Sequence, residues 1–176
     1  MSECPITMSR VWAMPHRYTF RVGALRDIVL KYKQQTTAIW LDPFAGQYSP
    51  AEITNDLDPK LPTLYHLEAA DFVQAMIDAG VRYGGAVFDP PYSLTQVSRS
   101  YAGIGLRFTG KENPTGGFPR VRDLLTELLP QGAYVVSFGW NTVGMGKKRG
   151  WEPIEYLICS HGGNRNDTLV TVERKG

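Results

Sequence analysis

Asp89-Pro90-Pro91-Tyr92 combines residue types that can hold a planar group carrying an amino function. The two prolines remove two backbone donors and fix two φ angles, so the turn is rigid before any ligand binds. Such a turn would present a carboxylate, the Pro90 carbonyl and an aromatic face in one fixed arrangement. A strand-ending turn with a solvated acid uses the same residue types, so the tetrapeptide alone leaves both interpretations open.

Strand and helix patterns alternate along the chain, which predicts an α/β domain with a mainly parallel sheet. Apolar residues at helical spacing predict helices over about 21–33, 69–77 and 121–128. Short apolar runs predict strands at 38–41, 52–56, 64–67, 86–88 and 134–138. Two further runs, 154–159 and 168–172, flank a glycine-rich turn and predict a closing hairpin.

Four acids fall where this sheet would expose them at one edge. Asp42, Asp56 and Asp89 come at or just after predicted strand ends, and Asp71 begins the second predicted helix. In parallel sheets, ligands bind beyond the carboxyl ends of the strands. The pattern therefore predicts a site that contains all four carboxylates.

Length and composition fit a single soluble domain over residues 1–176. No apolar run is long enough to span a bilayer, and the N-terminus lacks the layout of a secretory signal. Two cysteines and three scattered histidines do not suggest a disulfide framework or a metal site. A cytoplasmic protein without a bound metal is expected. Residues 93–119 show little periodicity and predict a substrate-binding or mobile loop.

The charge is segregated along the chain. Residues 41–92 contain eight acidic and two basic residues, whereas residues 93–150 contain eight basic and three acidic ones. An acid-rich centre flanked by basic segments suits a polyanionic partner. Chance clustering of solvated surface charges is the alternative.

Asp42-Pro43-Phe44-Ala45-Gly46 and Asp89-Pro90-Pro91-Tyr92 together resemble two motifs of the S-adenosylmethionine-dependent amino-methyltransferases. The resemblance is above all to the DNA adenine methyltransferases, and to small phage-type members among them. It covers the chain from about residue 17 to the C-terminal hairpin. It implies a Rossmann-like class I methyltransferase fold, S-adenosylmethionine as the cofactor, and methylation of the N6 amino group of adenine in DNA.

The resemblance also implies residue roles. In the catalytic motif Asp89, Pro90, Pro91 and Tyr92, the carboxylate and the Pro90 carbonyl would accept the two amino hydrogens, and the tyrosine would stack on the base. The implied cofactor contacts are Thr19, Phe20, Asp42, Pro43, Phe44, Gly46, Asn55, Asp56, Asp71 and Phe72.

Some of these cofactor roles have alternatives. Asp58 competes with Asp56 for the ribose hydroxyls, and Asn55 either assists or only caps the turn. Phe44 and Phe72 are also expected to contribute to core packing.

The chain departs from the family pattern after Gly46. Only residues 47–51 separate this glycine from the next predicted strand, which is too short for a helix with its connections. The first crossover helix is therefore expected to be shortened or missing. Because parallel pairing normally needs a longer crossover, the first two strands are expected to be short or to pair differently.

A base inside a duplex cannot reach such a site, so the target base would be flipped out or single-stranded. Arg99, Tyr101 and Arg107 are candidates for the substrate channel. Lys147, Lys148 and Arg149 are candidates for gripping the nucleic-acid backbone, although a solvated turn explains them as well. Because the chain has no separate recognition domain, we expect a short recognition sequence, weak specificity, or specificity supplied by a homodimer or a partner subunit.

Two other functions remain open from the sequence. Motifs similar to Asp-Pro-Pro-Tyr also serve RNA amino-methyltransferases. The shortened first motif is compatible with a catalytically inactive subunit that binds cofactor or nucleic acid.

Overall fold

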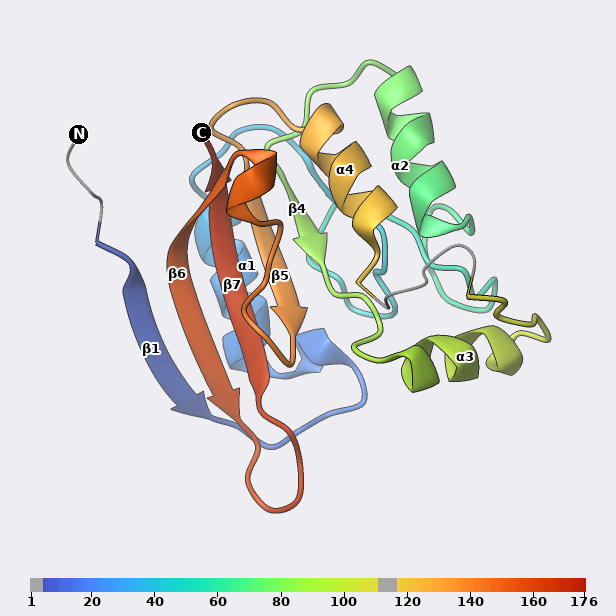
Figure 1. Cartoon of the computed structure of the whole chain (residues 1–176), viewed down its shortest axis with the longest axis horizontal. Helices are drawn as coiled ribbons and strands as arrows, with labels where there is room; N and C mark the ends of the chain where they lie inside the picture. Colours follow the sequence, from blue (N-terminus) through green and yellow to red (C-terminus); the bar gives the residue numbers. More distant parts are fainter. Residues whose placement is uncertain (1–4, 111–116) are drawn as a thin grey trace.

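The computed structural model describes residues 5–110 and 117–176. Within these residues, seven strands form one sheet in the order β1-β6-β7-β5-β4-β2-β3 (Figure 1). β7 is antiparallel to both of its neighbours, β5 and β6, and the other pairs are parallel. The strands are β1 (Thr7–Trp12), β2 (Trp40–Asp42), β3 (Ile53–Thr54), β4 (Gly85–Phe88), β5 (Tyr134–Gly139), β6 (Trp151–Ser160) and β7 (Thr168–Lys175).

This topology confirms the predicted α/β fold class, a mainly parallel sheet that closes with an antiparallel hairpin. The helices are α1 (Gly23–Lys33), α2 (Ala69–Asp78), α3 (Leu94–Gly103) and α4 (Pro119–Leu128). α1 covers one face of the sheet, whereas α2 and α4 cover the other (Figure 1). In the described part of the chain, no helix is long and apolar enough to span a bilayer.

β4 shows why the strand before the Asp-Pro-Pro-Tyr motif is apolar at every position. Val87 packs into the core beneath α1, whereas Ala86 and Phe88 pack into the core beneath α2 and α4. Successive side chains point to opposite faces, and both faces are buried here. The motif therefore follows a strand that is fixed from both sides.

Three elements differ from the sequence prediction. β1 was not expected, and five of its six residues are exposed, so it shows no apolar alternation. α3 occupies part of the segment 93–119 that was predicted as a loop; of its ten residues, all described, only Val97 is buried. Residues 111–116 of that segment lie outside the described residues. The strand predicted at 64–67 is reduced to one bridge between Asn55 and Tyr65.

β2 and β3 pair in parallel although only residues 43–52 connect them. These described residues form no helix, so the predicted loss of the first crossover helix is confirmed, and both strands are short. Polar contacts hold the loop instead. Glu52 accepts a hydrogen bond from the Trp40 amide at 2.8 Å and forms an ion pair with Lys33 at 2.7 Å.

Candidate functional site

A cavity of about 1170 Å³ opens beyond the carboxyl ends of β2, β3 and β4. Small-molecule sites typically span about 300–1,000 Å³, so this cavity is slightly larger than most of them. Fourteen of the predicted site residues line it: Thr19, Phe20, Pro43, Phe44, Gly46, Asn55, Asp56, Asp71, Asp89, Pro90, Pro91, Tyr92, Arg99 and Tyr101.

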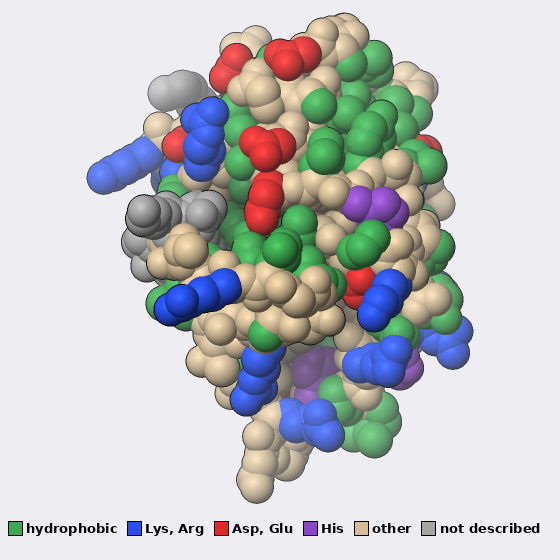
Figure 2. Space-filling view, turned by 90° about the vertical axis from the view of Figure 1, so that its right-hand side faces the viewer, with side chains coloured by type: hydrophobic (Ala, Val, Ile, Leu, Met, Phe, Trp, Pro, Cys, Tyr) green, Lys and Arg blue, Asp and Glu red, His purple; other side chains and the backbone are tan. Residues whose placement is uncertain are grey.

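Figure 2 shows the side of the molecule that carries α2 and α3. Asp and Glu side chains lie mostly in the upper and middle part of this face, and Lys and Arg side chains gather in its lower part and also lie at its upper left.

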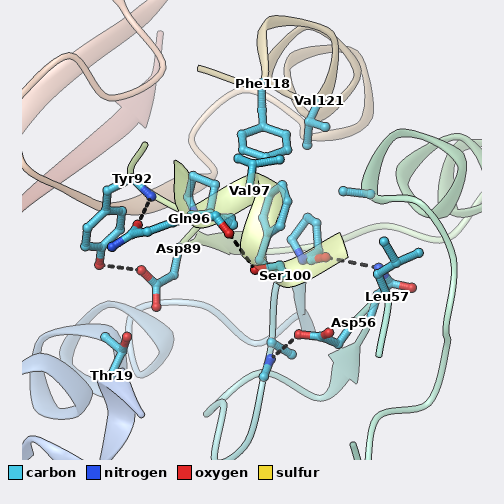
Figure 3. A pocket seen from close by; sticks show the side chains of 18 of the residues that line it. Thr19, Asp56, Leu57, Asp89, Tyr92, Gln96, Val97, Ser100, Phe118 and Val121 are labelled. Atoms are coloured by element: carbon cyan, nitrogen blue, oxygen red, sulfur yellow. Dashed lines mark hydrogen bonds between the residues drawn. The ribbon is translucent and has the colours of Figure 1, made fainter. Parts of the chain in front are cut away.

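The Asp89 carboxylate follows the last residue of β4 and faces the cavity (Figure 3). The Tyr92 hydroxyl donates a hydrogen bond to it at 2.6 Å. The Tyr92 ring packs edge-on against Trp140, with ring centroids 5.7 Å apart. Tyr92 thus has a contact with the Asp89 carboxylate that the predicted stacking role did not include.

Burial raises the pKa of Asp89 above its ordinary value, and the hydrogen bond from Tyr92 opposes that rise. Burial and the adjacent Asp89 charge raise the pKa of Tyr92, so its hydroxyl stays a protonated donor. A carboxylate that accepts from a neutral hydroxyl keeps its negative charge available to a hydrogen-bond donor on a substrate.

The start of α3 is tied to the same turn. Ser93 caps the helix by accepting from the Gln96 amide at 3.2 Å, and the Gln96 side-chain oxygen accepts from the Tyr92 amide at 2.6 Å. The pair is a variant of the capping box, in which two backbone donors at a helix start are satisfied reciprocally. α3 and the Asp-Pro-Pro-Tyr turn are consequently positioned together.

Asp56 joins the loop after β2 to the segment after β3. Its two carboxylate oxygens accept hydrogen bonds from the amides of Gly46 at 3.0 Å and Asp58 at 2.9 Å. Each oxygen retains a further lone pair for a ligand hydroxyl. Asp58 does not line the cavity, and its carboxylate accepts from the Lys60 amide at 3.0 Å. Of the two acids left open by the sequence, Asp56 is the one in the cavity.

The structure corrects the role predicted for Asp42. This residue is fully buried and does not line the cavity. Its carboxylate accepts from the Phe44 amide at 2.9 Å and from the Ser49 hydroxyl at 2.6 Å. Burial raises its pKa to about 8. Because both oxygens serve the loop, Asp42 shapes the cavity wall and does not touch its contents.

Asn55 and Phe72 also serve the fold. The buried Asn55 amide donates to the carbonyls of Pro43 and Leu67, both at 3.0 Å, and accepts from the Leu67 amide at 2.9 Å. Phe72 is fully buried and does not line the cavity, so its predicted cofactor contact is corrected. Helical geometry turns Phe72 toward the sheet and leaves Asp71, one residue earlier, exposed at the cavity.

The predicted substrate residues separate into two groups. Arg99 and Tyr101 lie on α3 at the cavity, and the Tyr101 hydroxyl donates to both carboxylate oxygens of Glu68, at 2.7 and 2.8 Å. Arg107 is exposed and does not line the cavity. α3 therefore closes one side of the cavity and is anchored to the residue before α2.

The Lys147, Lys148 and Arg149 cluster does not lie at the cavity, which corrects the role predicted for it. It forms the 3₁₀ helix η2 (Lys147–Arg149) just before β6. Since β6 runs parallel to β4 and β5, its first residue lies at the amino ends of these strands, opposite the cavity (Figure 1). Arg149 is engaged in an ion pair with Asp123 at 2.6 Å.

Several cavity residues were not predicted from the sequence. Gln96 stands three residues after Ser93, a spacing that signals a helix start. Arg120 follows the proline that begins α4, another helix-start signal. Others carry no recognisable motif, among them His16, Arg17, Glu68, Ser100, Phe118 and His161.

Within residues 5–110 and 117–176, no group of three or more His, Cys, Asp or Glu side chains is arranged to hold a metal ion. Cys159 is buried in β6 and does not line the cavity.

No family model matches the sequence, and no curated protein matches it either. Solved structures similar to this fold include SMU.776 complexed with SAH, at 11% identity over 85% of this chain and 49% of that one, with a TM-score of 0.49. TrmN from Thermus thermophilus is 16% identical over 88% and 49% of the two chains, with a TM-score of 0.47.

A third similar structure is the N-methyltransferase NodS from Bradyrhizobium japonicum WM9 in complex with S-adenosyl-L-homocysteine. It is 11% identical over 85% of both chains, with a TM-score of 0.46. The chain spans about half the length of SMU.776 and TrmN. Similarity at this level does not assign an activity to the cavity.

Proposed function

We propose that the protein is an S-adenosylmethionine-dependent methyltransferase that methylates the exocyclic N6 amino group of adenine in DNA. The observation that carries this proposal is the position of the Asp89 carboxylate. It lies in the same cavity as Asp56 and the loop residues Pro43, Phe44 and Gly46. The acceptor group and the cofactor can therefore meet in one enclosed space.

The residues present fit S-adenosylmethionine. The Asp56 carboxylate retains lone pairs for the two ribose hydroxyls, an arrangement of charge-assisted hydrogen bonds. Phe44 supplies an apolar wall, with its ring 4.7 Å from that of Phe118. Gly46 has a φ of +52° and no atom within 4 Å of the position a Cβ would take, so the backbone leaves open space there.

The cofactor would supply an electrophilic methyl group. The residues of the chain would orient the amino group of the substrate and make its nitrogen more nucleophilic. The lone pair of an exocyclic amine on adenine is delocalised into the ring, which makes the nitrogen a poor nucleophile. Asp89 would accept one amino hydrogen and the Pro90 carbonyl the other. Holding the two N–H bonds in these directions favours a pyramidal nitrogen, and the carboxylate stabilises the positive charge that develops on it. The Tyr92 hydroxyl keeps the carboxylate oriented.

Transfer of a labelled methyl group from S-adenosylmethionine tests the proposal. We expect label in single-stranded DNA, and less in duplex DNA because the base must first leave the stack. Asp89→Ala should abolish transfer and leave cofactor affinity within about tenfold, since Asp89 holds the amine and not the cofactor. Asp78→Ala removes an exposed acid at the end of α2, outside the cavity, and is the matched control.

Transfer to transfer RNA in the same assay, with none to DNA, would replace DNA by RNA as the substrate. Undiminished transfer by Asp89→Ala would refute the mechanism. Absence of cofactor binding by calorimetry at millimolar S-adenosylmethionine would refute the enzyme and favour a nucleic-acid-binding subunit.

A further inference from the structure

Three aromatic rings and two guanidinium groups form a continuous cluster beside the cavity. The ring of Tyr18 lies 5.6 Å from that of His16 and 5.5 Å from that of Tyr48. The Arg17 guanidinium lies over the Tyr18 ring at 4.4 Å, and that of Arg21 lies over the Tyr48 ring at 5.2 Å. We call these five residues the aromatic–arginine cluster.

The cluster lies at the surface and continues into the cavity. Tyr48 is 50% exposed, and His16, Arg17 and Arg21 are also exposed. His16, Arg17 and Tyr18 line the cavity, as do the next residue, Thr19, and Asp89. A chain that places one unit at Asp89 would therefore bring its neighbouring units to the cluster.

The backbone at Tyr48 is strained. Its φ is +73°, in the left-handed region that favours glycine and that bulky side chains rarely adopt. Glycine or asparagine would close the same turn with less strain. The ring is half exposed and adds little to the core, so packing does not explain why an aromatic residue stands here. Strained residues of this kind concentrate at ligand sites.

We infer that the aromatic–arginine cluster binds the bases and phosphates next to the target base in a single DNA strand. Aromatic rings with interleaved arginines are the surface chemistry of single-strand binding, because every base has a face that stacks and every phosphate a charge that pairs. The inference rests on the proposed function, since it concerns the same substrate, and it specifies that the strand is unpaired around the target.

Fluorescence anisotropy with a labelled DNA oligonucleotide, without cofactor, tests the cluster. Tyr48→Asn removes the ring and retains a residue that tolerates positive φ. We expect it to weaken single-strand binding about 5- to 150-fold, the loss typical of one stacked base, and to leave the thermal midpoint unchanged or raised. Tyr48→Phe keeps the ring and should bind as the unaltered protein does. Tyr65→Asn, which removes a partly exposed ring outside the cavity, should also bind normally.

Equal binding by Tyr48→Asn and the unaltered protein would overturn the inference, as would a loss seen only with RNA or only with duplex DNA. The proposed function fails separately. If Tyr48→Asn still transfers methyl groups with an unchanged KM for single-stranded DNA, the inference about the cluster is wrong and the proposed methyltransferase function stands. If binding of single-stranded DNA depends on the Tyr48 ring but the protein transfers no methyl group, the inference about the cluster is supported and the proposed methyltransferase function is refuted.

Discussion

At the residue scale, the hydroxyl of Tyr92 is the contact that most changes the interpretation of the motif. In the sequence it is an aromatic face for a base, whereas in the structure it is also a donor to Asp89 at 2.6 Å. Tertiary packing against Trp140 fixes the ring, and no local pattern reveals that partner. The motif and the acids at the strand ends were predictable, because strand ends are read from apolar runs. The directions of their side chains were not.

Tyr92→Phe should move the acid limb of the pH–rate profile for methyl transfer to higher pH. The Tyr92 hydrogen bond lowers the pKa of Asp89, so its removal raises that pKa further. The ionised carboxylate is the form that accepts the amino hydrogen, and more of it is lost at a given acidic pH. Measuring kcat/KM across pH 5–9 checks this; Tyr156→Phe, outside the cavity, is the control. Superimposable profiles would exclude the positioning role.

Asp42→Asn should flatten the dependence of stability on pH. The pKa of Asp42 is about 8 in the folded protein and near 3.8 when unfolded, so between these values the folded form binds a proton that the unfolded form releases. The contribution of this group therefore falls as pH rises from about 4 to about 8. Urea unfolding at several pH values should show a smaller loss in the variant. Parallel curves would contradict the assignment.

At the element scale, the helices with a clear apolar face were predictable and the exposed elements were not. α1, α2 and α4 each bury three or more residues at helical spacing, whereas α3 buries only Val97 and β1 none. The short crossover was visible from the spacing after Gly46. Its stabilisation by Lys33, Glu52 and Asp42 depends on contacts that spacing does not encode.

Asn55→Ala should destabilise the protein by about 2–4 kcal/mol, because the buried Asn55 side chain loses three hydrogen bonds to the backbone of Pro43 and Leu67. Chemical denaturation measures the change in the free energy of unfolding. Asn164→Ala, in the exposed turn between β6 and β7, should stay within about 0.5 kcal/mol. If Asn55→Ala lowers the free energy of unfolding no more than Asn164→Ala does, the Asn55 hydrogen bonds do not stabilise the fold.

At the scale of the whole molecule, strand direction determines which charges belong to the site. The sheet edge that gathers Asp56 and Asp89 was predictable, since both acids follow strands of the same direction. The basic cluster of η2 could not be placed from the sequence, where a grip on the nucleic-acid backbone and a solvated turn both remained open; it comes after β5. The chain then crosses to the opposite edge before the parallel strand β6 begins.

Salt dependence should distinguish the two groups of basic residues. Arg99→Ala and Arg120→Ala remove charges that line the cavity, so each should reduce the slope of log affinity for single-stranded DNA against log salt by about 0.7. Lys147→Ala and Lys148→Ala, at the opposite edge, should leave the slope unchanged. Titrations by anisotropy from low to moderate salt provide the measurement. If Lys147→Ala changes the slope and Arg99→Ala does not, the DNA binds away from the cavity.

The position of β7 between β5 and β6 has a consequence for how the chain folds. Thr7 of β1 pairs with Glu155 of β6, and β5 gains its partner on that side only from β7, which follows both β5 and β6 in the sequence. A growing chain therefore carries two unpaired strand edges, one on β5 and one on β6, until Thr168–Lys175 emerges. Such long-range pairing slows folding and exposes edges to other chains. We expect refolding yield to fall with rising protein concentration, through association before β7 enters the sheet.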